Sequence, residues 1–305
     1  MSDVHQLILT HGREAALQMA QTKEEKRLVE VAAEVMASEQ ESLGITYSGF
    51  CLTALPHREF QGERWVRHGH RVTLVVQSGT DRQGNPLGIP FGSRARMILL
   101  YLQTKAIQSG SREVELGRSM NEWLERMGLS AGGKTYRDVK EQASRISSAN
   151  LAFFWDGPGE SEVRANETIV SKAITFGNST DPRQGSLWTD KVELSENFFR
   201  ALREHPVPVR DAAIRQISGK SMALDAYIWL AYRLHTLDKR TTVRWAALYQ
   251  QFGAGIQKMF HFKPEFTSAL KLAMAAYPEA KVEVEREHII LHPSPPPVPK
   301  LTLVR

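Results

Sequence analysis

Residues 94–146 read RARMILLYLQTKAIQSGSREVELGRSMNEWLERMGLSAGGKTYRDVKEQASRI, and the chain repeats the pattern of this stretch further on. The second copy consists of LDAYIWLAYRLHT (224–236), TTVRW (241–245), WAALYQQFG (245–253) and KPEFTSALKLAMAAY (263–277). When Gly128 is aligned with Gly253, Trp123 lies opposite Leu248. In both copies a helical pattern is followed by a short strand pattern and then by two more helical patterns. The sequence therefore predicts two copies of one structural unit.

The order of elements in each copy predicts the fold. A candidate β-hairpin follows the last helix, with LAFFW (151–155) in the first copy and KVEVE (281–285) and HIILH (288–292) in the second. Helix, strand, helix, helix and hairpin are the elements of a winged helix, whose third helix usually lies in the DNA major groove. Two copies are too few for a solenoid, so we expect tandem domains that span two stretches of one duplex.

The predicted fold class is α+β, with two tandem winged-helix domains, the first enlarged by extra β-strands, and an N-terminal helical arm. We place the arm at 1–40, the first domain at 41–212 and the second at 213–305. The extra strands are ITYSGFCLTAL (45–55) and WVRHGHRVTLVV (65–76), which are rich in β-branched and aromatic residues. In the arm, residues 23–37 have helical spacing, and this helix either packs on the body or receives a partner.

The remaining segments are read from their turn and breaker residues. A loop is predicted at 78–92, where Gly, Pro, Asn and Asp are dense, and a hairpin turn at 157–160 (GPGE). SLWTDKVEL (186–194) reads as a strand and SENFFRALRE (195–204) as a helix with Ser195 as its N-cap. We expect the junction between the copies at HPVPV (205–209) and an extended tail from His292.

Charge points to the class of partner. The net charge is +5 and the pI is about 9.3. Residues 1–45 hold 4 Lys/Arg and 8 Asp/Glu, hence −4, so the other residues carry +9. A basic body favours a polyanionic partner, with nucleic acid as the first candidate. We expect a cytoplasmic protein without membrane association, because the apolar stretches are too short to span a bilayer and no secretion signal is evident.

One motif suggests an enzyme. GLSAGGKT (128–135) satisfies the phosphate-binding pattern G-x-x-x-x-G-K-[ST], and Asp156 ends an apolar run as a magnesium-binding Asp would. A P-loop must follow a buried strand, whereas the residues before Gly128 have helical spacing. We therefore expect a helix–helix turn, no enzyme and no cofactor, with a P-loop NTPase as the alternative. Cys51 is the only cysteine, and His68 and His70 have no third ligand at useful spacing, so no metal site is predicted.

The two third helices supply the candidate DNA-binding residues. Lys and Arg neutralise phosphates, and polar side chains on a recognition helix reach base edges. On the first helix the candidates are Lys134, Thr135, Arg137, Lys140, Ser144 and Arg145. On the second helix, with Pro264 in its first turn, they are Lys263, Thr267, Ser268 and Lys271, with Lys258 and His261 just before it. The alternative for each face is an ordinary solvated helix surface.

The chain also resembles a known family. GIPFGSRARMILLYLQTKA (88–106), SREVELGRSMNEWLERMGLSAGGKTYRDVKEQASRI (111–146) and LAFFW (151–155) are similar to plasmid replication initiators of the RepA type. The resemblance extends more weakly from about Ile45 to His292. It implies two winged-helix domains, binding to repeated origin sites (iterons), and copy control through monomer–homodimer exchange. It also implies recruitment of the host replicative helicase.

By this resemblance the second domain reads bases, and the first combines backbone contacts with dimerisation. Three other functions fit parts of the sequence. A transcriptional regulator could have the same domains, although no ligand-sensing domain is evident. A scaffold could use its winged helices to bind protein, for which the basic body is a poor fit. The third is the P-loop NTPase.

Overall fold

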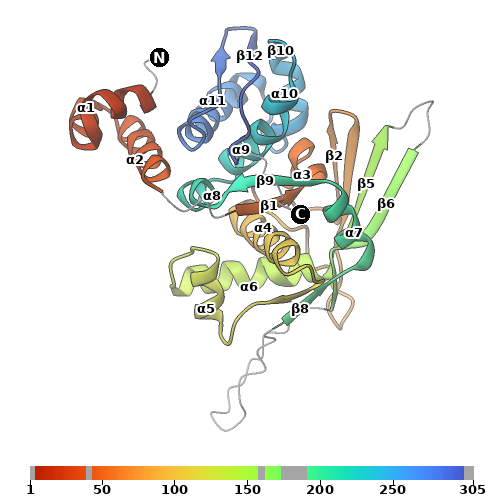
Figure 1. Ribbon diagram of the computed structural model, residues 1–305. Helices are drawn as coiled ribbons and strands as arrows, with labels where there is room; N and C mark the ends of the chain where they lie inside the picture. Colours follow the sequence, from red (N-terminus) through yellow and green to blue (C-terminus); the bar gives the residue numbers. More distant parts are fainter. Residues whose placement is uncertain (1–3, 39–42, 157–161, 173–190, 299–305) are drawn as a thin grey trace, which may run out of the picture. The chain divides into compact units, whose positions relative to one another are not determined.

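The structure is a computed structural model that describes residues 4–38, 43–156, 162–172 and 191–298 (Figure 1). It is a mixed helix-and-sheet protein with small sheets, as the predicted α+β class requires. The chain forms two compact units, here called the central unit (Ile45–Pro206) and the terminal unit (Met1–Gly44 with Val207–Arg305). The contact pattern thus divides the chain at 44/45 and 206/207, while the domain bounds 1–40, 41–212 and 213–305 stay a prediction.

The central unit contains two antiparallel sheets and the helices around them. One sheet has the strand order β2-β3-β5-β6 and the other β4-β8-β7. The elements from the first boundary onward are β1 (Leu43–Tyr47), α3 (Ser48–Leu52), β2 (Arg64–Gly69), β3 (Val72–Gln77), α4 (Gly92–Ser109), β4 (Glu113–Glu115), α5 (Met120–Arg126), α6 (Gly133–Ser148), β5 (Asn150–Asp156), β6 (Glu162–Thr168), β7 (Val170–Lys172), β8 (Lys191–Leu194) and α7 (Glu196–Glu204).

Helix α4 forms the centre of this unit. Ala95, Ile98 and Leu102 are fully buried, because α4 packs against α6, α7 and β4. Arg96 is also buried, and its guanidinium donates to the carbonyl oxygens of Leu55 (2.8 Å), Pro56 (3.2 Å) and Gly92 (2.8 Å). A buried charge is tolerated when it is fully hydrogen-bonded, so Arg96 ties the segment before the 78–92 loop to the core helix.

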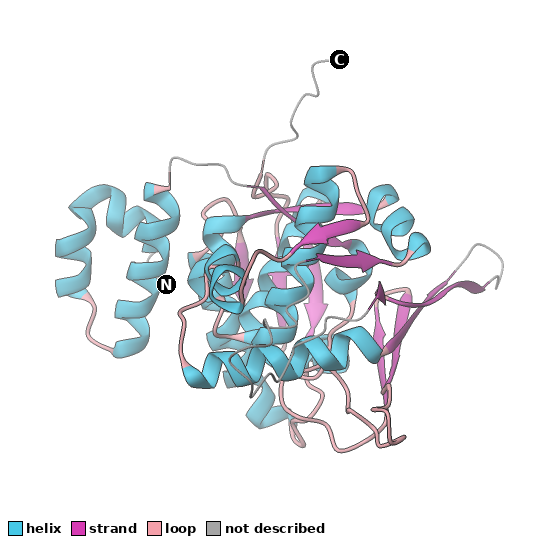
Figure 2. Cartoon of the chain, turned by 90° about the horizontal axis from the view of Figure 1, so that it is seen from below, coloured by secondary structure: helices cyan, strands magenta, loops and turns pink. Residues whose placement is uncertain are grey.

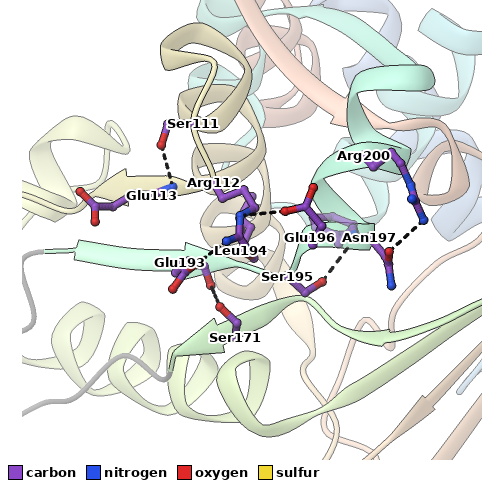
Figure 3. A network of polar contacts seen from close by, with 11 residues as sticks. Ser111, Arg112, Glu113, Ser171, Glu193, Leu194, Ser195, Glu196, Asn197 and Arg200 are labelled. Atoms are coloured by element: carbon purple, nitrogen blue, oxygen red, sulfur yellow. Dashed lines mark hydrogen bonds and ion pairs between the residues drawn. The ribbon is translucent and has the colours of Figure 1, made fainter.

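Strand β4 pairs with β8, and a polar network reinforces this pairing (Figure 3). The Arg112 guanidinium lies 2.8 Å from the Glu193 carboxylate and 3.1 Å from that of Glu196. Ser171 Oγ donates to the Glu193 carbonyl oxygen at 3.1 Å and so joins β7 to the same sheet. Because such half-exposed pairs contribute little singly, the network mainly fixes which strands are neighbours.

The terminal unit has one three-stranded antiparallel sheet, in which β12 lies between β10 and β11. Its elements are α1 (Val4–Met19), α2 (Lys23–Ala37), β9 (Pro206–Arg210), which begins at the unit boundary, α8 (Asp211–Ile217), α9 (Ser221–Arg233), the 3₁₀ helix η1 (Leu234–Thr236), β10 (Thr241–Arg244), α10 (Trp245–Phe252), α11 (Met259–Ala275), β11 (Val282–Val284) and β12 (His288–Leu291).

An aromatic cluster holds α10 and α11 together. Phe266 of α11 lies 5.3 Å from Phe262 and 5.0 Å from Phe252, measured between ring centroids. Trp245 meets the Phe266 ring edge to face at 6.2 Å. Rings of this size dominate the apolar area that a small unit buries. One side of α11 is therefore fixed in the core, and its opposite side faces outward.

The tail after β12 is anchored by a tyrosine and an arginine. Tyr277 donates its phenolic proton to the Pro295 carbonyl oxygen at 2.6 Å, and burial raises the pKa of this phenol. Arg210 donates to the Pro297 carbonyl oxygen at 2.8 Å. The described part of the tail, up to Val298, contains neither helix nor strand, as predicted from its prolines.

Helices α1 and α2 lie side by side (Figure 2). Helix α2 also packs against α8 and α11 of the same unit. Arg27 donates to the Gln216 carbonyl oxygen at 2.5 Å, and the buried His5 side chain lies 3.0 Å from the Ala275 carbonyl oxygen. Within its own unit, residues 23–37 are therefore a packed helix, one of the two alternatives stated for this segment.

Two predicted strands differ from the structure. In 45–55 the strand ends at Tyr47 and helix α3 follows, and its C-cap residue Thr53 donates through Oγ1 to the Gly49 carbonyl oxygen at 2.7 Å. The segment 65–76 is not one strand but a hairpin of β2 and β3, with Arg71 at φ 60 in its turn. β-Branched composition signals strand without revealing where a tight turn interrupts it.

Several other segments follow the prediction. Residues 195–204 form the expected helix, and Ser195 Oγ accepts from the Phe198 amide at 3.3 Å as its N-cap. The hairpin after α6 is present as β5 and β6. The predicted turn at 157–160 lies outside the described residues, as does the first part of the strand predicted at 186–194, of which β8 is the described end.

Candidate nucleic-acid interface

Helix α6 begins where the sequence predicts the first candidate recognition helix. It starts at Gly133 after a short turn from α5, in which Gly128 adopts a left-handed φ of 69 that suits glycine. The apolar spacing of this helix predicts an inner face of Tyr136, Val139, Ala143 and Ile146, of which the last three are buried and Tyr136 is half-buried. Of the predicted DNA-binding residues, Lys134 and Arg137 are exposed, and Lys140 and Ser144 are half-buried.

Two of the predicted residues on α6 do not lie on the outward face. The side chain of Thr135 is buried. Arg145 is also buried, and its guanidinium lies 2.6 Å from the carboxylates of both Glu59 and Glu141. The prediction that Arg145 faces outward is wrong, because helical spacing alone takes no account of the loop that covers that side of the helix.

The covering loop is the GIPFG stretch before α4. Arg145 donates to the Ile89 carbonyl oxygen at 3.1 Å and stacks over the Phe91 ring at 4.9 Å from its centroid. A Cβ at Gly88, which has φ 88, would lie 2.7 Å from the Arg145 guanidinium. Two stretches far apart in the sequence therefore meet at this arginine, and only a glycine allows the close approach.

The P-loop pattern joins two helices. Helix α5 ends at Arg126, and Trp123 and Leu124 in it are fully buried, so a helix precedes Gly128 where a P-loop requires a strand. Residues Gly132 and Gly133 lie in open space, and a Cβ at either would meet nothing within 4 Å. The first turn of α6 is accordingly accessible, and helix N-termini bind anions through their free N–H groups.

Helix α11 starts earlier than predicted. It begins at Met259 with Lys258 as the N-cap, so His261 lies inside the first turn instead of before the helix. Pro264 is within the helix, not in its first turn. Proline there removes one helical hydrogen bond, and the cost is limited because Pro264 is exposed and close to the helix start. A start read from proline preference alone is therefore wrong by about one turn.

The outward residues of α11 line an open depression of about 470 Å³. Its wall includes four predicted residues: Lys263, Thr267, Ser268 and Lys271. The turn between β11 and β12 contributes Val284, Glu285 and Arg286, and α2 contributes Glu24. All these residues belong to the terminal unit. The depression thus lies where the third helix of the second copy meets its own hairpin.

Contacts across the depression fix the position of one lysine. Lys263 Nζ donates to the Arg286 carbonyl oxygen at 2.9 Å and lies 5.5 Å from the centroid of the Trp245 ring. The Arg286 side chain is 95% exposed at the hairpin tip. One cation is thus placed in the wall of the depression, and another extends from the hairpin.

Two residues of this surface were missed from the sequence. Phe260 is 65% exposed, and its ring centroid lies 3.8 Å from that of His261. Counting in helical steps back from Lys271 and Thr267 leads to Phe260, so the i, i+4, i+7 and i+11 spacing could have revealed it. Arg286 lies between two predicted strands, and that position alone marks it as the tip of a hairpin.

The described residues offer no cluster for a metal ion and no membrane-spanning helix. Among them, no three His, Cys, Asp or Glu side chains come together as a metal site, and His68 Nδ1 lies 3.1 Å from Thr73 Oγ1. Within the same ranges no helix combines the length and apolarity needed to cross a bilayer. Cys51 is buried, as expected for a small core residue.

The chain is similar to solved structures and to one protein family. The chain is similar over 79% of its length to crystal structures of domains 2 and 3 of RctB, with 12% sequence identity and TM-scores of 0.48 and 0.46. These matches cover 94% and 93% of the RctB chains. A search among curated proteins finds no match. The family model of the plasmid-encoded RepA protein matches residues 89–249, from the loop before α4 into α10. Since this is more than half of the chain, the chain belongs to the family of plasmid-encoded RepA proteins.

Proposed function

We propose that this protein is a sequence-specific, double-stranded DNA-binding initiator of plasmid replication, built on two winged-helix domains. The observation that carries the proposal is the outward face of α11, where Lys263, Thr267, Ser268 and Lys271 lie beside the β11–β12 hairpin with Arg286 at its tip. A winged helix presents its recognition helix and hairpin to DNA in this way. Membership of the RepA family supports the replication role.

In this proposal α11 enters the major groove and reads bases. Ser268 and Thr267 offer hydroxyl groups that can donate to or accept from base edges. Lys271 and Lys263 supply positive charge for phosphates or for guanine acceptors. The neighbouring Arg286 is almost fully exposed and lies 3.6 Å from the Glu287 carboxylate, so it can exchange this exposed ion pair for a phosphate at the groove edge.

Helix α6 has a different role in the proposal. Its open N-terminus at Gly132 and Gly133 and the exposed side chains of Lys134 and Arg137 are suited to phosphates. Phosphate contacts fix the position of a protein on the duplex but carry no sequence information directly. The central unit would therefore add affinity, and the terminal unit specificity.

The finer properties follow from the family resemblance. We propose that the DNA sites are direct repeats in a plasmid origin, that the protein exchanges between monomer and homodimer, and that it recruits the host replicative helicase. It would act in the cytoplasm as a non-enzymatic DNA-binding protein, without a cofactor. The P-loop alternative is tested separately below, because it predicts nucleotide binding at Lys134.

The test is binding to direct repeats found beside the chain's own gene. Fluorescence anisotropy with a labelled repeat, and with a scrambled duplex of the same composition, measures both affinities at one salt concentration. We expect the repeat to bind tighter by a factor on the order of 10³ or more. Equal affinities for the two duplexes would contradict sequence-specific recognition.

A further inference from the structure

The first turn of α2 shares the depression with the outward face of α11. Glu24 of α2 lines the same depression as Lys263 and Lys271. Glu24 and Glu25 are exposed, and the attraction between Glu25 and Lys271 is one of the smaller causes that lower the pKa of the Glu25 carboxyl. Carboxylates therefore stand beside the cations that we assign to DNA.

The Glu25 carboxylate is held in place by the start of the helix. Thr22 Oγ1 accepts from the Glu25 amide at 3.1 Å, and the Glu25 carboxylate accepts from the amides of Gln21 (2.8 Å) and Thr22 (2.9 Å). This reciprocal capping fixes the first turn. The hydrogen bond from Thr22 is the largest cause of the lowered pKa of Glu25, so the carboxyl is ionised at neutral pH.

The rest of α2 is also fixed to the terminal unit. Val29, Val31 and Ala32 are buried, and Arg27 donates to the Gln216 carbonyl oxygen of the segment that contains α8. His5 of α1 contacts the carbonyl oxygen of Ala275, the last residue of α11. The acidic turn is thus part of the folded unit, placed beside α11 by contacts on both sides.

We propose that the first turn of α2 is an acidic guard, in which Glu24 and Glu25 compete with DNA phosphates for Lys271 and so weaken non-specific binding. This inference rests on the proposed function. A phosphate that approaches Lys271 meets two carboxylates, and like charges at close range repel even in salt solution. On the preferred site Lys271 can contact a guanine acceptor instead of a phosphate, so the guard acts mainly on random DNA and raises the ratio of specific to non-specific affinity.

The experiment neutralises the guard in the full chain. Glu24→Gln with Glu25→Gln removes two negative charges, and Gln keeps the capping geometry because its side-chain oxygen still accepts from the backbone. The matched control is Glu14→Gln with Glu34→Gln, which changes the net charge equally on the same helical pair, away from the depression. Thermal unfolding verifies that both variants fold.

The guard variant should bind a random duplex about three- to tenfold tighter than the control, with a salt slope steeper by up to about 1. In a Lys271→Ala background this gain should largely disappear. Equal affinities of guard and control variants for random DNA would overturn the inference. If the double variant failed to fold, Glu24→Gln alone gives the same test, because Glu24 takes no part in capping.

The same titrations separate this inference from the proposed function. If no variant, including the unmodified chain, bound the repeat more tightly than random DNA, the proposed function would fail. If the unmodified chain bound the repeat specifically while the guard and control variants did not differ, only the guard would fail.

Discussion

Helices α6 and α11 occupy the same place in the repeat, yet their polar faces are used differently. On α6, Arg145 is turned into the protein, where it contacts Glu59 and the loop before α4. On α11, Lys263 and Lys271 stay at the surface and line an open depression. The local sequence pattern makes both helices amphipathic. Which of their cations stay accessible to a ligand depends on the segments from elsewhere in the chain that pack on the polar face.

The sheets beside the two helices also differ, because the first copy contains extra strands. In the terminal unit, β10 pairs with β12, so the strand and the hairpin of one copy form a single sheet. In the central unit, β4 pairs with β8 and the hairpin strand β5 pairs with β3. In the first copy, other strands thus pair with both the short strand β4 and the hairpin strand β5. Only in the second copy do the short strand and the hairpin pair with each other.

The largest expected effect is the loss of DNA affinity as the salt concentration rises. Its slope reports the phosphate contacts of both units together. We expect the log–log slope of affinity for origin DNA to lie between about −5 and −9, corresponding to on the order of 6–10 neutralised phosphates. Titrations from low to physiological salt measure it. A slope near zero would show that neither helix contacts the DNA backbone.

Arg145→Ala sharpens the contrast within α6. Removing the guanidinium should lower the free energy of unfolding by about 2–3 kcal/mol, because this buried cation pairs with two half-exposed carboxylates and donates to the Ile89 carbonyl oxygen. Arg137→Ala on the exposed side of the same helix should change stability by less than about 0.5 kcal/mol. Urea unfolding measures both. Equal losses would mean that the two arginines are not in different environments.

Phe260→Ala tests the aromatic end of the α11 face. An exposed ring at this place can contact thymine methyl groups or a base face, so its loss should cost about 1–2 kcal/mol of affinity for the preferred site. Stability should be unchanged because the ring is mostly exposed. Binding titrations measure the affinity, and thermal unfolding measures the stability. A large loss of stability with unchanged affinity would make Phe260 a structural residue.

Lys134→Ala should have the smallest effect. We expect no heat of ATP and Mg²⁺ binding in either the unmodified chain or the variant, because a helix precedes Gly128 where a strand is needed. Isothermal calorimetry measures this directly. Micromolar binding that disappears in the variant would promote the P-loop enzyme over the DNA-binding protein.

The sequence predicts the helices of both copies well, because apolar spacing is a local signal. The inner face of α6, the order of elements around α11 and the helix at 23–37 follow from that spacing, whereas only the structure decides that this last helix is packed within its own unit. One hairpin was harder to predict: β2 and β3 read as one strand because the turn at Arg71 contains a residue that rarely adopts positive φ.

The candidate site was less predictable than the helices. Arg145 looked like an outward cation because nothing in its own helix reveals that Gly88, Ile89 and Phe91 cover it. Glu24 was assigned to a helix in a separate arm, and only the fold brings it beside Lys271. Both cases depend on contacts between residues far apart in the sequence, which periodicity cannot show.

The most direct test compares paired substitutions on the two helices. We expect replacing Ser268 and Lys271 with alanine to cost about 1–3 kcal/mol on the preferred site and little on random DNA. Replacing Arg137 and Lys140 with alanine should weaken both kinds of binding alike. Competition titrations against specific and random duplexes measure all four affinities. If the α6 pair lost specificity and the α11 pair lost none, the proposed division between the units would be reversed.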